Sequence, residues 1–140
     1  MQLELAQKIL AAALADARAR KFNPLTVAVL DARGALKAFA AEDGTSLKRG
    51  EIAVGKAHGA LAMGLGSRTL AKIATDRPQF VAAVAHAVGV LIPVAGGVLV
   101  RDGSGALLGA VGVSGDTSDN DEIAALAGIA AAGCKADPGA

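Results

Sequence analysis

The stretch Gly105–Glu122, with the sequence GALLGAVGVSGDTSDNDE, decides the fold that we expect for this chain. It begins as a run of small and apolar residues over 106–115, which is typical of a strand buried on both faces. A turn of glycine and serine follows, and Thr117 or Ser118 then stands at the capping position of a helix expected over 119–134. Acidic residues fall at the positive end of that helix. The stretch therefore predicts a central strand, a tight turn and a capped helix.

The remaining elements follow from hydrophobic spacing and turn residues. Leucine and isoleucine recur at helical spacing over 2–20, which predicts an amphipathic helix. The apolar runs 25–31 and 35–42 flank a turn at Gly34 and predict a β-hairpin. Further elements are helices over 46–64, 66–74 and 76–88 and a strand over 91–102, broken by Pro93 and the pair Gly96 and Gly97. The tail from residue 135 onward is expected to fray.

The predicted element order is therefore α-β-β-α-α-α-β-β-α. Strands that come in hairpin pairs indicate an antiparallel sheet with helices packed on it, because parallel sheets need βαβ crossovers. The fold class is α+β. A length of 140 residues suits one domain that covers 1–140.

Composition excludes some partners and favours another. The net charge is only +1, and the chain has three Phe but no Trp or Tyr, so we expect no nucleic-acid partner. Hydrophobic residues make up 53% of the chain, and much of that is alanine. The alanine-rich faces of the helices over 2–20, 46–64 and 119–134 are broader than one small sheet covers. They predict a homo-oligomer, at least a dimer, with one of these helices at the contact.

Cysteine usage and hydropathy indicate a cytoplasmic protein without a membrane partner. The single Cys134 has no partner for an internal disulfide, and its surroundings do not mark a nucleophile. Charges at Glu4, Lys8 and Asp16 interrupt the N-terminal segment, which therefore does not resemble a signal peptide. No uncharged run reaches membrane-spanning length. The sequence has no HExxH, CxxC or Cys/His cluster, so no metal site is expected.

The glycine turns are the first candidate ligand site. Neither GLGSR at 64–68 nor GVSGD at 112–116 matches a nucleotide-binding fingerprint. A turn between a strand and a capped helix nevertheless presents backbone N–H groups that suit a carboxylate. Two interpretations stay open, a structural turn and a binding turn. The binding interpretation places a small pocket, with Lys56 as counter-charge to Asp116, at six residues: Lys56, Gly96, Gly97, Ser114, Gly115 and Asp116.

The two histidines are the second candidate. On its helix His58 lies at the edge of the apolar face, whereas His86 points nearly opposite to the buried face. Either one is expected at the surface or in a subunit contact. A neutral imidazole also suits an axial haem ligand or a general base, and this second interpretation stays open for both.

Three segments together resemble the GlcG/HbpS-like family, which includes the C-terminal domain of PduO-type proteins. They are LTVAVLDARGALKAFAAEDG at 25–44, EIAVGKAHGAL at 51–61, and the stretch from Ile92 to Gly128. The resemblance covers about residues 3–133. It implies a profilin-like fold, homo-oligomers, and haem binding or haem degradation. One departure is visible, because Ala41 stands where members commonly carry a basic residue.

Two functions are expected on these grounds, and a third stays open. The first is an oligomeric haem-binding protein, with haem degradation as an added activity and His58, His86 or Met63 as the axial ligand. The second is a small-molecule-binding accessory protein or enzyme of a catabolic operon, with its pocket at the GVSGD turn. The third is a structural partner protein whose pocket is vestigial. The sequence assigns no catalytic residue.

Overall fold

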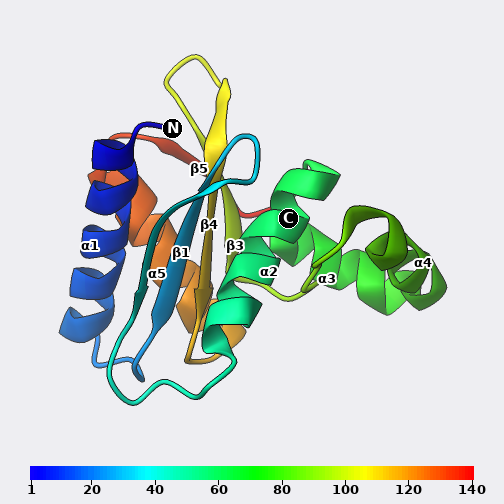
Figure 1. Ribbon diagram of the computed structural model, residues 1–140, viewed down its shortest axis with the longest axis horizontal. Coiled ribbons are helices and arrows are strands. Elements are labelled where there is room, and N and C mark those ends of the chain that lie inside the picture. The colour runs from blue at the N-terminus through cyan, green and yellow to red at the C-terminus, as the bar shows by residue number, and fades with distance from the viewer.

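A five-stranded antiparallel sheet with helices on both faces forms the body of the computed structural model, which describes all residues 1–140 (Figure 1). The strands lie in the order β2-β1-β4-β3-β5. Their bounds are β1 Thr26–Asp31, β2 Leu36–Ala41, β3 Gly97–Arg101, β4 Leu107–Ser114 and β5 Lys135–Asp137. The helices are α1 Leu3–Ala19, α2 Arg49–Met63, α3 Ser67–Asp76, α4 Pro78–Val88 and α5 Ser118–Ala131. The α+β class and the nine predicted elements are confirmed.

Strand β4 lies at the centre of the sheet, as its apolar sequence predicts. It pairs with β1 on one side and β3 on the other. Gly112 explains how closely the next layer approaches, because a Cβ atom there would overlap the Ala53 carbonyl oxygen of α2. The glycine therefore lets a helix backbone rest directly on the strand. The space above this position is filled by the protein itself.

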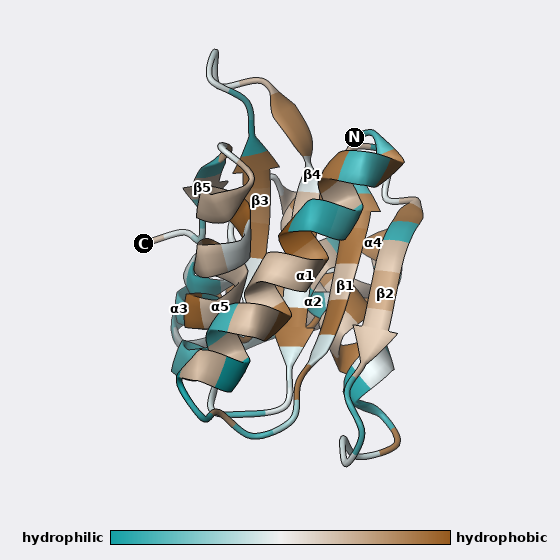
Figure 2. Ribbon diagram, turned by 90° about the vertical axis from the view of Figure 1, so that its left-hand side faces the viewer, coloured by the Kyte–Doolittle hydropathy of each residue, from teal (hydrophilic) through white to brown (hydrophobic).

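Helices α1 and α5 lie side by side over one face of the sheet (Figure 2). They enclose the larger core, which holds fourteen fully buried residues, among them Ile9, Val29 and Val111. Gly128 on α5 brings the two helices together, since a Cβ there would meet the Ile9 carbonyl oxygen and the Ala13 side chain. The broad alanine faces of α1 and α5 are thus covered by each other and by the sheet. The predicted contact of one of these helices with a second subunit stays a prediction.

Helix α2 covers most of the opposite face, and the start of α3 contacts β3 beside it. Its core there is smaller and consists of Leu30, Ala57, Ala60, Leu99 and Ala110. Helices α3 and α4 continue away from the sheet and form an arm at the far side of the molecule (Figure 1). Helix α4 has no buried residue although its sequence is largely apolar. None of the five helices is both long and apolar enough to span a membrane.

The start of α5 and the C-terminal tail are both held in place by hydrogen bonds. Thr117 is the cap of α5, and its Oγ1 accepts a hydrogen bond from the Asn120 amide at 3.2 Å. The prediction that the tail frays is wrong, because residues 135–137 form the edge strand β5 beside β3. The segment after β5 is also fixed, since the Pro138 carbonyl accepts from the Arg68 amide. Strand β3 would otherwise leave a row of backbone groups unpaired, and β5 satisfies them.

Candidate functional site

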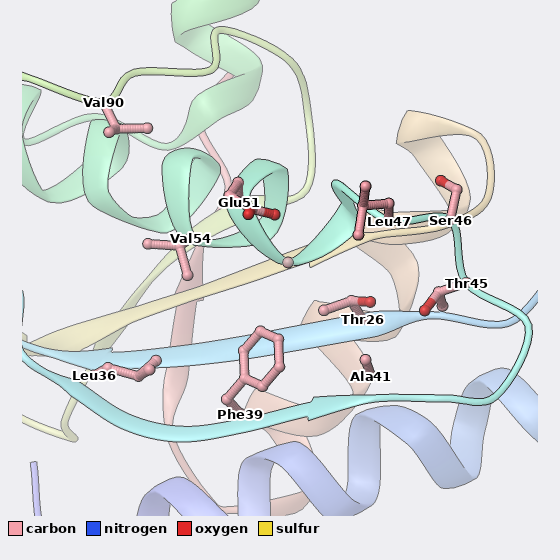
Figure 3. A pocket seen from close by; sticks show the side chains of 11 residues that line it. Thr26, Leu36, Phe39, Ala41, Thr45, Ser46, Leu47, Glu51, Val54 and Val90 are labelled. Atoms are coloured by element: carbon pink, nitrogen blue, oxygen red, sulfur yellow. The ribbon is translucent and has the colours of Figure 1, made fainter.

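An open apolar cavity of about 460 Å³ lies between β2 and the N-terminal half of α2 (Figure 3). We call it the α2 groove. Strand residues, helix residues and the loop that joins them all contribute to its walls. Its lining residues are Thr26, Leu36, Phe39, Ala41, Thr45, Ser46, Leu47, Gly50, Glu51, Val54 and Val90.

Strand β2 supplies the apolar wall because its side chains face α2 without being covered by it. Phe39 is 46% exposed and Leu36 is 54% exposed, which is unusual for residues of this size in a sheet. The Phe39 ring packs close to Gly50 in the first turn of α2, where a Cβ would stand 3.1 Å from its Cζ atom. An irregularity in the β1–β2 register pairs Leu30 with Leu36 and so places Leu36 on the same face as Phe39.

Thr26 forms part of the floor and carries the one polar atom that the fold leaves without a partner. The residue is fully buried, and its Oγ1 accepts and donates no hydrogen bond. A buried hydroxyl in this state costs about 1–3 kcal/mol. Ala41, opposite Thr26 on β2, also lines the groove. The departure from the family pattern at Ala41 therefore removes a charge from this wall.

His58 stands one turn after Val54 on α2, beside the Val90 end of the groove but not among its lining residues. Its Nδ1 donates a hydrogen bond of 2.6 Å to the Val90 carbonyl, and the Val90 side chain lines the groove. The Nε2 atom consequently keeps its lone pair in the neutral ring. Gly34 and Gly89 flank the ring edge that carries Nε2, because a Cβ atom on either glycine would lie 3.9 Å from His58, at Cδ2 and Cε1 respectively. A second cavity of about 230 Å³ opens beside the ring.

Lys56 and Asp121 form a buried ion pair across the end of the sheet. The Lys56 Nζ atom lies 2.9 Å from Asp121 Oδ2 and 2.8 Å from the Val113 carbonyl oxygen. Both side chains are at most 3% exposed. Burial lowers the pKa of Lys56 and raises the pKa of Asp121, and the mutual attraction of the two charges opposes both changes. The pair joins α2 to α5.

Asp116 is not the partner of Lys56, which corrects the sequence prediction. Its carboxylate accepts hydrogen bonds from the amides of Thr117 and Asn23 and from the Asn120 side chain. The Thr117 amide, followed by the Asn23 amide, lowers the pKa of Asp116. The Asp116 amide donates instead to Asp121. Lys56 does point inward, as expected, but it reaches Asp121, the second acid of α5.

The glycines of the predicted pocket are packed against protein atoms. A Cβ at Gly96 would lie 2.9 Å from Lys56 Nζ, and one at Gly97 would overlap the Lys56 carbonyl. Ser114 is fully buried and accepts a hydrogen bond from Arg49. Gly115 does line a cavity, but a small polar one that excludes the other predicted residues. Lys56, Gly96 and Gly97 therefore lie together as predicted, but they fill the space that a ligand would need.

The structure separates the two histidines. His86 lies on α4 and is exposed, and its side chain has no hydrogen bond within the chain. Sequence reasoning missed the α2 groove and Arg49. The apolar residues Leu36 and Phe39 of β2 could have indicated the groove. In the sequence they resemble ordinary core residues, and only the position of α2 shows that they are exposed. No group of three His, Cys, Asp or Glu side chains lies close enough together to hold a metal ion.

Comparison with known proteins places this architecture in a family. The family model described as "Haem degrading protein HbpS-like" matches residues 1–130. The crystal structure of HbpS has a TM-score of 0.81 and 30% sequence identity, and the match covers 93% of this chain and 88% of that one. The PduOC:heme complex gives 0.85 and 24%, with 96% of each chain covered. Klebsiella pneumoniae ORFY gives 0.80 and 22%, with 94% of this chain and 90% of that one.

A search of curated protein sequences finds no match. The residues matched by the family model include both walls of the α2 groove, the second cavity beside His58 and the buried Lys56–Asp121 pair. The agreement in fold also extends over nearly the whole length of each neighbour. The chain therefore belongs to the HbpS-like family.

Proposed function

We propose that this chain binds haem in the α2 groove, with His58 as the axial ligand. The observation that carries the proposal is the hydrogen bond from His58 Nδ1 to the Val90 carbonyl. A bond of this kind fixes the orientation of a ligating histidine and leaves its other nitrogen free to coordinate iron. Membership in the HbpS-like family supports the same function.

The residues present fit a flat, largely apolar group. Phe39, Val54 and Val90 offer apolar surface on three sides of the groove, and no charged side chain other than Glu51 lines it. The glycines on either side of His58 leave its Nε2 edge open. Haem, when bound, would supply the redox-active iron. The chain would hold the ring, orient His58 through Val90 and exclude water from one face.

Haem degradation is the second part of the proposal and rests on the family description. The groove is open, so dioxygen and an external reductant would reach a bound ring. We expect the Soret band of the haem-loaded protein to bleach when ascorbate is added in air. Haem that stays intact under these conditions, while free haem is consumed, would limit the function to binding.

A titration with haem tests the binding proposal directly. The unchanged protein should give a saturable Soret shift, His58→Ala should lose it, and His86→Ala should keep it. His86 is a matched control because it is exposed and lies on the α4 arm. Equal shifts in both variants, or loss of the shift in His86→Ala alone, would contradict the assignment of His58.

We also propose that the chain forms a homo-oligomer and that α4 is at the contact. None of its apolar side chains is fully buried, and Val90 and Val94 just beyond it are 55% and 39% exposed. Light scattering should give a mass above 13.7 kDa. Ala83→Glu on α4 should reduce that mass, whereas Ala11→Glu on the exposed side of α1 should not. A monomer in the unchanged protein would overturn the proposal.

A further inference from the structure

A small polar cavity of about 260 Å³ adjoins the α2 groove at the end away from His58. The two share Thr45 and Ser46, and no hydrophobic residue lines the polar one. Arg49, at the start of α2, and Gly115, in the turn after β4, both line it. An apolar slot thus continues into a polar compartment that holds a guanidinium group.

The Arg49 guanidinium has no carboxylate partner within the chain. The one hydrogen bond of its side chain goes from Nη1 to the neutral Ser114 hydroxyl at 3.2 Å, and the side chain forms no salt bridge. Five of the other six arginines are paired with carboxylates, and the sixth, Arg77, lies over the Phe80 ring. The guanidinium of a half-buried arginine keeps several donors that can hold a carboxylate in a bidentate manner.

The acids around Arg49 do not neutralise it. Asp121 is engaged by Lys56 and by the Asp116 amide. Glu51 pairs with Lys48 at 3.3 Å, and Asp116 already accepts three hydrogen bonds. Burial has the largest effect on this pair, lowering the pKa of Lys56 and raising the pKa of Asp121, and the smaller effect of the Arg49 charge is to lower both pKa values. The two positive charges of Arg49 and Lys56 and the one negative charge of Asp121 sum to a local excess of one positive charge.

Thr26 supplies a second, independent indication of a ligand. It is fully buried, lines the α2 groove and has an unpartnered hydroxyl. The register of β1 and β4 places it opposite Ser114, which accepts the hydrogen bond from Arg49. Figure 3 shows its hydroxyl at the end of the groove where Thr45 and Ser46 lie. The unsatisfied group and the unpaired cation therefore meet at the junction of the two cavities.

We propose that this junction is a carboxylate subsite, in which Arg49 holds the carboxylate of an amphipathic ligand whose apolar body lies along the α2 groove. Thr26 and Ser46 add hydroxyl donors beside it. The site goes beyond the haem proposal, because it requires neither iron nor His58. A free aliphatic acid and a porphyrin propionate share the chemistry that it recognises.

Calorimetric titration with octanoate, 1-octanol and metal-free protoporphyrin IX tests the site. Octanoate should bind at least tenfold more tightly than 1-octanol, since a charge-assisted contact is lost in the alcohol. Arg49→Gln should remove that difference and leave 1-octanol unchanged, and Thr26→Val should weaken octanoate less. Arg77→Gln is the matched control, because Arg77 also lacks a salt bridge but lies on the α4 side.

The outcomes separate the two sources of a carboxylate. Loss of octanoate binding in Arg49→Gln assigns the site to aliphatic acids, and loss of the porphyrin alone assigns it to propionates. Equal binding of octanoate and octanol to the unchanged protein overturns the proposal without need of any variant. So does an Arg49→Gln protein that melts like the unchanged one and binds both acids as tightly. None of these results depends on haem binding, so the two proposals fail separately.

Discussion

The two faces of the sheet are built from similar residues but are covered to different extents. On one face α1 and α5 lie together and enclose fourteen fully buried residues. On the other face α2 encloses five and stops short of β2. Alanine is the commonest core residue on the helical side of both contacts. Both helical layers also sit so close that added Cβ atoms at Gly128 and Gly112 would overlap neighbouring atoms.

The face that is covered by fewer helices is the one with room for a ligand. Two helices are wide enough to cover five strands, whereas one helix leaves the edge strand β2 with its apolar side chains in the open. The groove is therefore a consequence of the number of helices on that face. The α1/α5 face should respond to substitution through stability, and the α2 groove through binding.

The largest effect is expected where the two faces are joined. Lys56→Met should lower the free energy of unfolding by about 3–5 kcal/mol, because Asp121 would remain buried without its counter-charge. Urea unfolding measures the change. The double variant Lys56→Met/Asp121→Asn should recover part of the loss. A single variant as stable as the unchanged protein would show that the pair does not hold the two faces together.

Next in size is a truncation in the α1/α5 core. Ile9→Ala should lower the free energy of unfolding by about 2–5 kcal/mol, since Ile9 is fully buried among packed side chains. Ala11→Val on the exposed side of α1 serves as the control for a change within the same helix. A loss of less than about 1 kcal/mol for Ile9→Ala would mean that this face is packed more loosely than its burial indicates.

The corresponding truncation in the groove should separate stability from binding. Phe39→Ala removes a ring that is 46% exposed, so we expect the free energy of unfolding to fall by less than about 1 kcal/mol. Haem affinity should fall at least tenfold, because the ring forms a wall of the groove. A large loss of stability with unchanged haem binding would reverse the contrast between the two faces.

The smallest effect concerns pH. Hydrogen bonds from the Thr117 and Asn23 amides lower the pKa of Asp116 in the folded state. Its stabilising contribution is therefore complete above the unfolded-state pKa of about 4 and is lost as the pH falls through the lower folded value. Urea midpoints at pH 7 and pH 3 should differ less for Asp116→Asn than for the unchanged protein. An equal difference would remove Asp116 from the acid response.

Most of the fold could be predicted from the sequence and most of the site could not, for physical reasons. Strand β4 is predictable because its apolar run and the glycine turn are local signals, and Thr117 is a local cap. The partner of Lys56 depends on which acid of α5 turns inward, and this is set by packing across 65 residues of sequence. Strand β5 escaped prediction because Lys135–Asp137 has no strand pattern and forms only beside β3.

The groove needed the structure for the same reason. Phe39 and Leu36 look like core residues in the sequence, and only the position of α2 shows that they stay exposed. His58 was a candidate from its place on the helix, but its hydrogen bond to Val90 connects residues 32 positions apart. Close contacts that span the chain are set by the assembled fold, and local patterns do not encode them individually.

Amide chemical shifts can show whether ligands bind on the α2 face. Zinc protoporphyrin IX is diamagnetic and accepts one axial nitrogen, so it can be titrated into 15N-labelled protein. We predict that the large shifts fall on β2, the first three turns of α2 and residues 89–94, with His58 among them. The largest shifts on α1 and α5, or around His86 on α4, would contradict the account.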